Sequence, residues 1–248
     1  MSRDTLFDTP QKPVPPFTFD ARVAEVFNDM IRRSVPAYSE IVRRQVQLVD
    51  RFHQPGTRIY DLGCSTANLG LSLCRHRPES DFAMVAVDNS EPMIRRCRAR
   101  LATVPRPERI SLVCGDILSI RIQNASVVAL NYTLQFLPLD DRAALLRRIA
   151  AGLVPGGILL FCEKVIHGEP FLAELQQRFY HAYKREMGYS DLEISQKREA
   201  LEKVLVPETV ETHLRRLRET GFAAVVIWHK WFNFAAFIAV KALPGGGL

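Results

Sequence analysis

The stretch that decides the fold is Ile59-Tyr60-Asp61-Leu62-Gly63-Cys64-Ser65-Thr66-Ala67. It begins as a short apolar strand and turns at small residues, and a helical pattern follows from about Leu69. The plan repeats at residues 84–89, where the apolar run Met84-Val85-Ala86-Val87 ends in Asp88 and Asn89. Strands that alternate with helices in this way predict an α/β fold with a parallel sheet.

Small residues where one strand ends and an acid where the next ends are typical of a nucleoside site. Gly63 lets the backbone approach a ligand closely, and the Asp88 carboxylate can accept hydrogen bonds from ribose hydroxyls. The turn is not the dinucleotide fingerprint G-x-G-x-x-G. It reads D-x-G-x-S-x-A and resembles the D-x-G-x-G-x-G loop of S-adenosylmethionine (SAM)-dependent methyltransferases, with Ser65 and Ala67 in place of two glycines.

The composition is that of an intracellular globular chain without a metal centre. Its 248 residues fit one α/β domain, and no apolar run approaches the roughly 20 residues that span a bilayer. The N-terminus lacks the basic-then-apolar order of a secretory signal. The five cysteines are scattered without a C-x-x-C pair, and the histidines lack metal-ligand spacing. We therefore expect free thiols, a cytoplasmic location, no membrane association and no metal.

The net charge of +6 is modest, and its arginines are spread over several helical segments. No block of like charge is interleaved with aromatic residues, as a nucleic-acid surface would require. We interpret most arginines as solvated helix faces and expect no direct binding of nucleic acid.

The pattern along the chain predicts one SAM-binding domain over residues 1–248. Asp20 is positioned to cap a first N-terminal helix, and Ser39 a second. The expected segments are a proline-rich extended arm (1–16), N-terminal helices (17–54), a cofactor-binding core (57–163), a charged helical insertion (168–205), and a final helix with a terminal hairpin (206–248).

The expected sheet is seven-stranded and mostly parallel, with an antiparallel hairpin at its end. This is the plan of the Rossmann-like class I methyltransferase fold. We expect strands at 57–62, 83–88, 110–114, 126–131, 157–163, 223–228 and 234–241, and helices near 68–77, 91–101 and 140–152.

Polar residues follow the predicted strands, and each can be interpreted either as a ligand-binding residue or as a purely structural one. Asp88 fits a ribose diol, or it belongs to the cap of the next helix. Asp116 fits the exocyclic amine of adenine, or it is a turn residue, and Asn131 lies beside the sulfonium end of a cofactor, or it only ends a strand. Together with the Gly63 loop they indicate a SAM site, because ligands bind open α/β sheets at this edge.

Two further residues have competing interpretations. Cys64 is flanked by the loop, but no nearby histidine reads as its partner, which favours a small buried thiol over a nucleophile. The guanidinium of Arg198 in the insertion can donate two hydrogen bonds to one carboxylate. The residue pattern alone, however, favours a solvent-exposed arginine on a helix.

The chain resembles the carboxy-S-adenosyl-L-methionine synthase family over nearly its whole length. Most of the matching stretches lie outside the generic cofactor loop. They are residues 3–7 (RDTLF), 19–27 (FDARVAEVF), 33–36 (RSVP), 60–65 (YDLGCS), 88–90 (DNS), 115–117 (GDI), 133–137 (TLQFL), 192–198 (LEISQKR), 210–213 (VETH) and 232–234 (FNF).

The resemblance implies that prephenate supplies a carboxyl group to the methyl of SAM, which gives carboxy-SAM and phenylpyruvate. A partner enzyme then uses carboxy-SAM to carboxymethylate 5-hydroxyuridine at the tRNA wobble position, and the product is handed over without direct tRNA binding by this chain. Arg198 would come from the neighbouring subunit of a homodimer and clamp the new carboxylate. Carried over by motif, the cofactor-binding residues are Tyr38, Gly63, Cys64, Ser65, Asp88, Asn89, Asp116, Ile117, Asn131 and Arg198, with Arg198 also catalytic.

Two rival functions remain open at this stage. One is an ordinary methyltransferase that acts on a small acid or RNA, since the cofactor loops alone do not exclude it. The other is a non-catalytic SAM-binding partner of an RNA-modifying enzyme, which would need no anion clamp.

Overall fold

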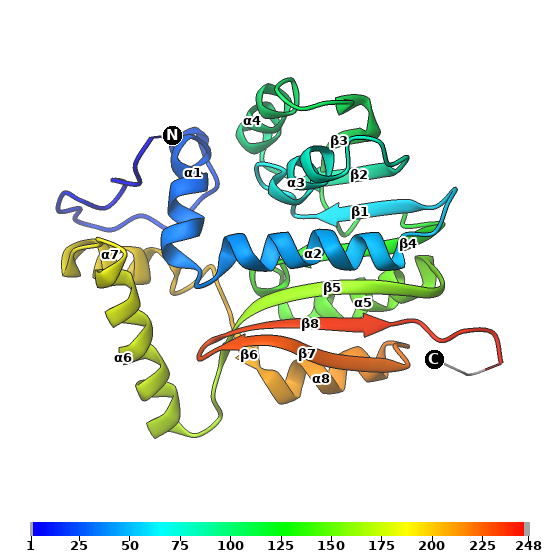
Figure 1. Ribbon diagram of the computed structural model, residues 1–248. Helices are drawn as coiled ribbons and strands as arrows, with labels where there is room; N and C mark the ends of the chain where they lie inside the picture. Colours follow the sequence, from blue (N-terminus) through cyan, green and yellow to red (C-terminus); the bar gives the residue numbers. More distant parts are fainter. Residues whose placement is uncertain (1, 246–248) are drawn as a thin grey trace.

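The expected parallel sheet forms the centre of the computed structural model, which describes residues 2–245 (Figure 1). β1 (Arg58–Leu62) lies between β2 (Ala83–Asp88) and β4 (Ala125–Asn131) in parallel pairing, and β3 (Ile110–Cys114) follows β2 at one edge. β5 (Leu153–Ile166) pairs in parallel with β4 and antiparallel with β8 (Phe234–Val240), which pairs with β7 (Ala224–Trp231). The order β3-β2-β1-β4-β5-β8-β7 confirms the class I methyltransferase plan.

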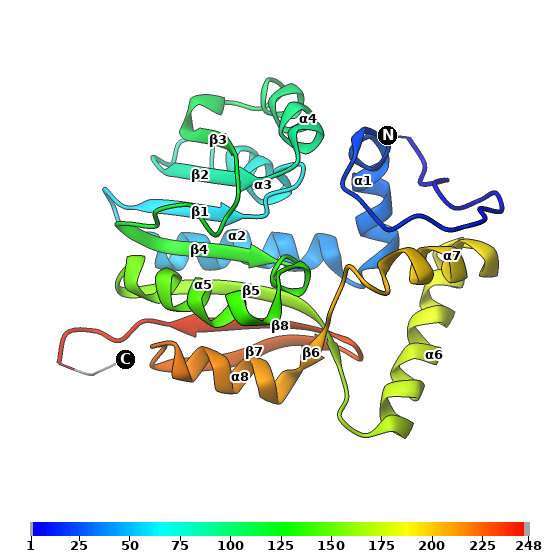
Figure 2. The ribbon, with the colours of Figure 1, turned by 180° about the vertical axis from the view of Figure 1, so that it is seen from behind.

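Helices cover both faces of this sheet (Figures 1 and 2). On one face lie α2 (Tyr38–Phe52), α3 (Asn68–His76) and α4 (Glu91–Leu101), and on the other lie α5 (Leu139–Gly152) and α8 (Val210–Glu219). The apolar strands explain this arrangement, because β4 buries both of its faces and so needs a layer on each side.

A third group of elements lies beyond the carboxyl ends of the parallel strands (Figure 2). It consists of α1 (Ala21–Ser34), α6 (Pro170–Glu186), α7 (Asp191–Leu201) and the N-terminal arm. The arm has no helix or strand before α1, yet it is pinned, because Phe7 is buried in a cluster with α1 and the Asp4 backbone N–H donates to Asp29. These elements cover the edge of the sheet at which the sequence predicts a bound ligand.

The local signals set most element boundaries. Asp20 caps α1 as expected, since its carboxylate accepts a hydrogen bond from the backbone N–H of Val23. The expected Ser39 cap is wrong: Ser39 lies inside α2, whose first residue is Tyr38, and the cap position is taken by Ala37 in the left-handed conformation (φ 56°). Pro36 disfavours a helical conformation for the preceding Val35, which is extended and ends α1, and α2 then begins after the turn at Ala37.

The structure also contains short elements that the sequence pattern did not predict. A two-residue strand β6 (Glu208–Thr209) pairs with the far end of β5, which runs longer than expected. Two 3₁₀ turns, η1 (Pro107–Arg109) and η2 (Leu134–Phe136), precede β3 and follow β4. No helix within residues 2–245 combines the length and apolarity needed to cross a membrane.

Candidate functional site

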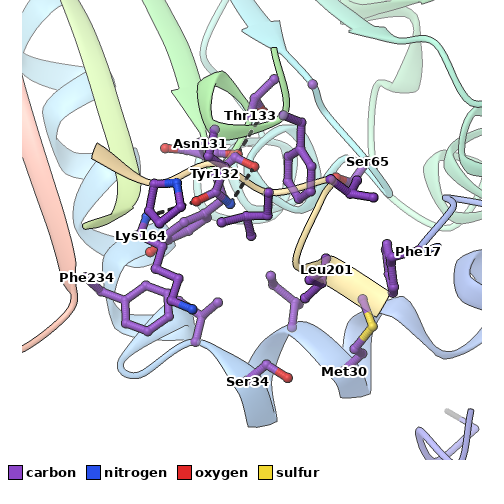
Figure 3. A pocket seen from close by; sticks show the side chains of 18 of the residues that line it. Phe17, Met30, Ser34, Ser65, Asn131, Tyr132, Thr133, Lys164, Leu201 and Phe234 are labelled. Atoms are coloured by element: carbon purple, nitrogen blue, oxygen red, sulfur yellow. Dashed lines mark hydrogen bonds between the residues drawn. The ribbon is translucent and has the colours of Figure 1, made fainter. Parts of the chain in front are cut away.

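A cavity of about 780 Å³ opens at the carboxyl ends of the parallel strands, beneath α1, α6 and α7. In the view of Figure 3, Lys164 and Phe234 lie on one side of it, and Ser65 and Phe17 on the other. Every residue predicted for the site lines this cavity. They are Tyr38, Gly63, Cys64, Ser65, Asp88, Asn89, Asp116, Ile117, Asn131 and Arg198.

The loop after β1 has a backbone shape that glycine would adopt most easily. Gly63 has φ +76°, and a Cβ atom there would lie 2.2 Å from Thr133 Oγ1, so only glycine fits. Ser65 (φ 49°) and Ala67 (φ 59°) are also left-handed, although both carry a side chain. The loop therefore keeps its shape where two glycines are replaced, and the backbone remains close to the cavity.

Two buried acids mark one end of the cavity. Asp88 accepts hydrogen bonds from the backbone N–H groups of Ser65 and Ser90, both at 2.9 Å, so it ties the loop to α4. Ser90 itself caps α4, which leaves Asp88 free of that role. Asp61 is 4% exposed, and burial together with the charge of Asp88 raises the pKa of its carboxyl to about 7. Such a pair favours a ligand that carries positive charge.

Asp116 and Asn131 lie where the next strands end. Asp116 is exposed and accepts a hydrogen bond from the backbone N–H of Leu118 at 2.9 Å. It is therefore a turn residue, and it also lines the cavity. The Asn131 amide exchanges two hydrogen bonds with the fully buried Gln45 of α2, at 2.8 and 2.9 Å. This pair fixes the orientation of the Asn131 side chain.

The Cys64 thiol lacks the features of a nucleophile. It is 5% exposed, and its hydrogen bond with Cys97 together with burial raises its pKa well above the ordinary value. A thiol held in its protonated form agrees with the interpretation as a small buried side chain.

The loop after β4 is held by Glu163, a residue that the sequence analysis missed. Its buried carboxylate accepts hydrogen bonds from the backbone N–H groups of three consecutive residues. They are Thr133, Leu134 and Gln135. This contact places Thr133 against Gly63. Sequence alone carries no signal for it, because an acid within an apolar strand has no distinctive spacing.

The opposite end of the cavity is basic. Lys164 of β5, Lys184 of α6 and Lys197 of α7 line it, together with His181 and Arg198. Lys197 forms a buried ion pair with Asp4 of the N-terminal arm at 3.3 Å. None of these three lysines was singled out from the sequence, since the fold alone brings β5, α6 and α7 together.

Arg198 lies on the exposed side of α7, yet it lines the cavity of its own chain. Among residues 2–245 it has no hydrogen-bond or carboxylate partner. An arginine without a partner at the basic end is available to an anion. The expectation that it serves a neighbouring subunit stays a prediction.

Within the described part of the chain, no group of three His, Cys, Asp or Glu side chains is placed to hold a metal ion.

Comparisons with known proteins identify the family of this chain. The family model described as a methyltransferase domain matches residues 59–157. A carboxy-S-adenosyl-L-methionine synthase from Desulforapulum autotrophicum is 50% identical over 97% of this chain and 98% of its own. Another from Haemophilus ducreyi is 46% identical over 98% of this chain and all of its own. The chain belongs to the carboxy-S-adenosyl-L-methionine synthase family.

Solved structures agree on the fold of this carboxy-S-adenosyl-L-methionine synthase family member. A magnesium protoporphyrin IX methyltransferase from Synechocystis, solved with bound SAH, is similar with a TM-score of 0.60 at 13% identity, covering 86% of this chain and 87% of its own. Human N-acetylserotonin methyltransferase, solved with SAM, gives 0.55 at 16% identity, over 90% and 55%. The chain is thus a SAM-dependent transferase on a methyltransferase fold.

Proposed function

We propose that this enzyme converts SAM and prephenate to carboxy-SAM and phenylpyruvate. The observation that carries the proposal is that one cavity has two ends of opposite charge. Asp61, Asp88 and Asp116 lie at the strand ends, and Lys164, Lys184 and Arg198 lie at the opposite end. SAM is a cation at its sulfur and prephenate is a dianion, so the charges of the cavity complement both substrates.

The cavity residues fit SAM. Asp88 would accept hydrogen bonds from the ribose hydroxyls and Asp116 from the adenine amine, and both residues line the cavity at the ends of neighbouring strands. Asp61 adds a buried carboxylate near the loop, where a cationic ligand offsets the cost of its charge. Tyr38 and Asn131 line the wall between the two ends, with Asn131 held by Gln45.

The reaction balances without a further reactant. The methyl group of SAM is weakly acidic because it adjoins a positive sulfur, and prephenate becomes aromatic when it releases CO2 and its ring hydroxide. The CO2 becomes bonded to the methyl carbon, and the hydroxide leaves with the methyl proton as water. The chain's part is to hold the anion with its cations, and to keep water out beneath the roof of α1, α6 and α7.

Replacing Asp88 with alanine should weaken SAM binding by about 1–3 kcal/mol, the scale for losing hydrogen bonds to a charged acceptor. Calorimetry on the folded variant measures this directly. Asp81→Ala is the matched control, because Asp81 is exposed near the amino end of β2 and does not line the cavity. Unchanged SAM affinity in Asp88→Ala would remove the ribose assignment.

The chemistry of the product indicates how it is used. Carboxy-SAM is a carboxymethyl donor, and we propose that it serves a tRNA carboxymethyltransferase that modifies the wobble uridine, with hand-over between the two enzymes in the cytoplasm. We also propose that the enzyme is a homodimer in which Arg198 of one subunit clamps the new carboxylate in the other. No direct tRNA binding by this chain is part of the proposal.

The alternative is an ordinary methyltransferase, and a simple measurement separates the two. The purified protein is denatured and the nucleoside that it releases is weighed by mass spectrometry. The proposal expects a nucleoside heavier than SAM by the mass of CO2, retained by the unpaired cations of the cavity. Only SAM or S-adenosylhomocysteine, even after supply of prephenate, would favour the alternative.

A further inference from the structure

The basic end of the cavity is built from lysines that alternate with aromatic rings. Lys164 Nζ lies 5.1 Å from the centroid of the Tyr180 ring, and Lys184 Nζ lies 5.6 Å from the same ring. Lys184 Nζ also lies 5.2 Å from the Tyr189 ring, and Lys197 Nζ lies 5.4 Å from that ring. Three cations thus share two rings, which is close for groups that repel one another.

Only one of these lysines has a carboxylate partner among the described residues. Lys197 pairs with Asp4, which is 2% exposed, and its ammonium also donates to Ser34 Oγ at 3.2 Å. Lys184 is 4% exposed, and within residues 2–245 neither its ammonium group nor that of Lys164 forms a hydrogen bond or an ion pair. Charge balance at this end is therefore incomplete.

An unpaired lysine in a buried place costs the ligand-free protein stability. Burial, together with the positive charges of Lys197 and Lys164, lowers the pKa of Lys184 to about 7, although Asp4 and Glu193 partly oppose them. Burial, with the charge of Arg198, also lowers the pKa of Lys164. An anion bound between these groups would offset this loss of stability. The lysines therefore form a candidate anion-binding site.

The Tyr180 ring, which both Lys164 and Lys184 approach, is fixed by two further contacts. Its hydroxyl donates a hydrogen bond to the backbone carbonyl of Ser34 at 2.9 Å, and its ring packs edge-on against Phe234 at 5.3 Å. The result is a fixed aromatic ring with two ammonium groups near it. A ligand that joins a carboxylate to a flat carbon ring would match both features.

We propose that Lys164 and Lys184, which both lie beside the Tyr180 ring, bind the pyruvyl carboxylate of prephenate, the one that remains in phenylpyruvate. The assignment rests on the proposed function and gives the two carboxylates separate sites. Arg198 serves the carboxylate that moves to SAM, and the lysine pair serves the carboxylate that stays. Lys197 is excluded from the pair because Asp4 already neutralises it.

Lys184→Met and Lys164→Met test this, since methionine keeps the length of the side chain and removes the charge. Each should raise the KM for prephenate and the inhibition constant of phenylpyruvate by about tenfold or more. The affinities for SAM and carboxy-SAM should not change, because neither molecule carries the pyruvyl group. Arg198→Ala should instead lower the affinity for carboxy-SAM and leave the inhibition constant of phenylpyruvate and the SAM affinity nearly unchanged. Lys203→Met is the control, as Lys203 is exposed and does not line the cavity.

A thermal melt of each variant monitors folding, and Lys184→Met should melt higher than the parent protein without ligand, because a buried unpaired charge is gone. An unchanged KM for prephenate with an unchanged phenylpyruvate constant would overturn the proposal. Equal losses for SAM and prephenate would also overturn it, since they would indicate a structural effect.

Failure of the proposed function itself would look different. In that case the parent protein makes no carboxy-SAM from SAM and prephenate. Calorimetry with phenylpyruvate as the probe then tests the carboxylate subsite independently of the reaction. Binding that Lys184→Met weakens would support a carboxylate subsite, and equal binding or no binding by parent and variant would reject it.

Discussion

Replacing Arg198 with alanine should lower the affinity for carboxy-SAM far more than the affinity for SAM. A guanidinium meets a planar carboxylate in two charge-assisted hydrogen bonds, and each contributes roughly 1.5–3 kcal/mol. The methyl group of SAM offers no acceptor, so the SAM affinity should barely change. Turnover should fall together with the carboxy-SAM affinity. Arg198→Lys should recover only part of the preference, because an ammonium cannot reproduce the planar fork.

Calorimetry with both ligands measures the Arg198 effect, and Arg178→Ala is a matched control. Arg178 lies exposed on α6, pairs with Glu174 and does not line the cavity. Equal losses of affinity for SAM and carboxy-SAM in Arg198→Ala would contradict the clamp.

Mixed subunits show which chain supplies the clamp. An inactive Arg198→Ala protein is combined with an inactive Asp88→Ala protein, and heterodimers are isolated. If the site is shared between subunits, as the resemblance implies, one of the two composite sites carries neither defect and activity returns. If Arg198 serves the cavity that it lines in its own chain, each site carries one defect and activity does not return.

Replacing Asp61 with asparagine should have opposite effects on stability and on SAM binding. In the folded chain the pKa of Asp61 is raised to about 7 from an ordinary 3.8, so the folded state holds a proton that the unfolded state releases. The ionised carboxylate therefore destabilises the fold as pH rises from about 4 to 7, and the full cost is present above 7. The variant should be more stable at pH 8 by on the order of 2–4 kcal/mol, and equally stable near pH 4.

The same substitution should weaken SAM binding at pH 8, because a cationic ligand loses a nearby carboxylate. In the parent protein the SAM affinity should fall as pH drops below about 7, where Asp61 takes up its proton, and in Asp61→Asn this part of the pH dependence should disappear. Denaturant unfolding and calorimetry across pH 5–8 measure both effects. An asparagine variant that is no more stable at pH 8 and binds SAM normally would contradict this role.

The acidic end of the site could be predicted from the sequence because each of its parts is local. Asp61, Asp88 and Asp116 each follow an apolar run, and parallel strands bring such ends to a common edge. The strands themselves follow from their apolar runs and from the turns between them. These signals need no knowledge of which distant segments meet.

The basic end could not be predicted in the same way. Lys164, Lys184 and Lys197 come from three elements that meet only after folding, and Asp4 reaches Lys197 across 193 positions of sequence. The proline-rich arm indicated an extended segment, but nothing local in it shows that Asp4 would be buried. Lysines in charged helices read as solvated faces until the tertiary structure buries them.

An isotope label shows whether prephenate supplies the new carboxyl group. The parent enzyme is incubated with SAM and with prephenate that carries ¹³C in its ring carboxyl group, in the presence of unlabelled bicarbonate, and the products are resolved by mass spectrometry. Labelled carboxy-SAM should form together with an equal amount of unlabelled phenylpyruvate. Unlabelled carboxy-SAM, or S-adenosylhomocysteine in its place, would contradict this source of the carboxyl group.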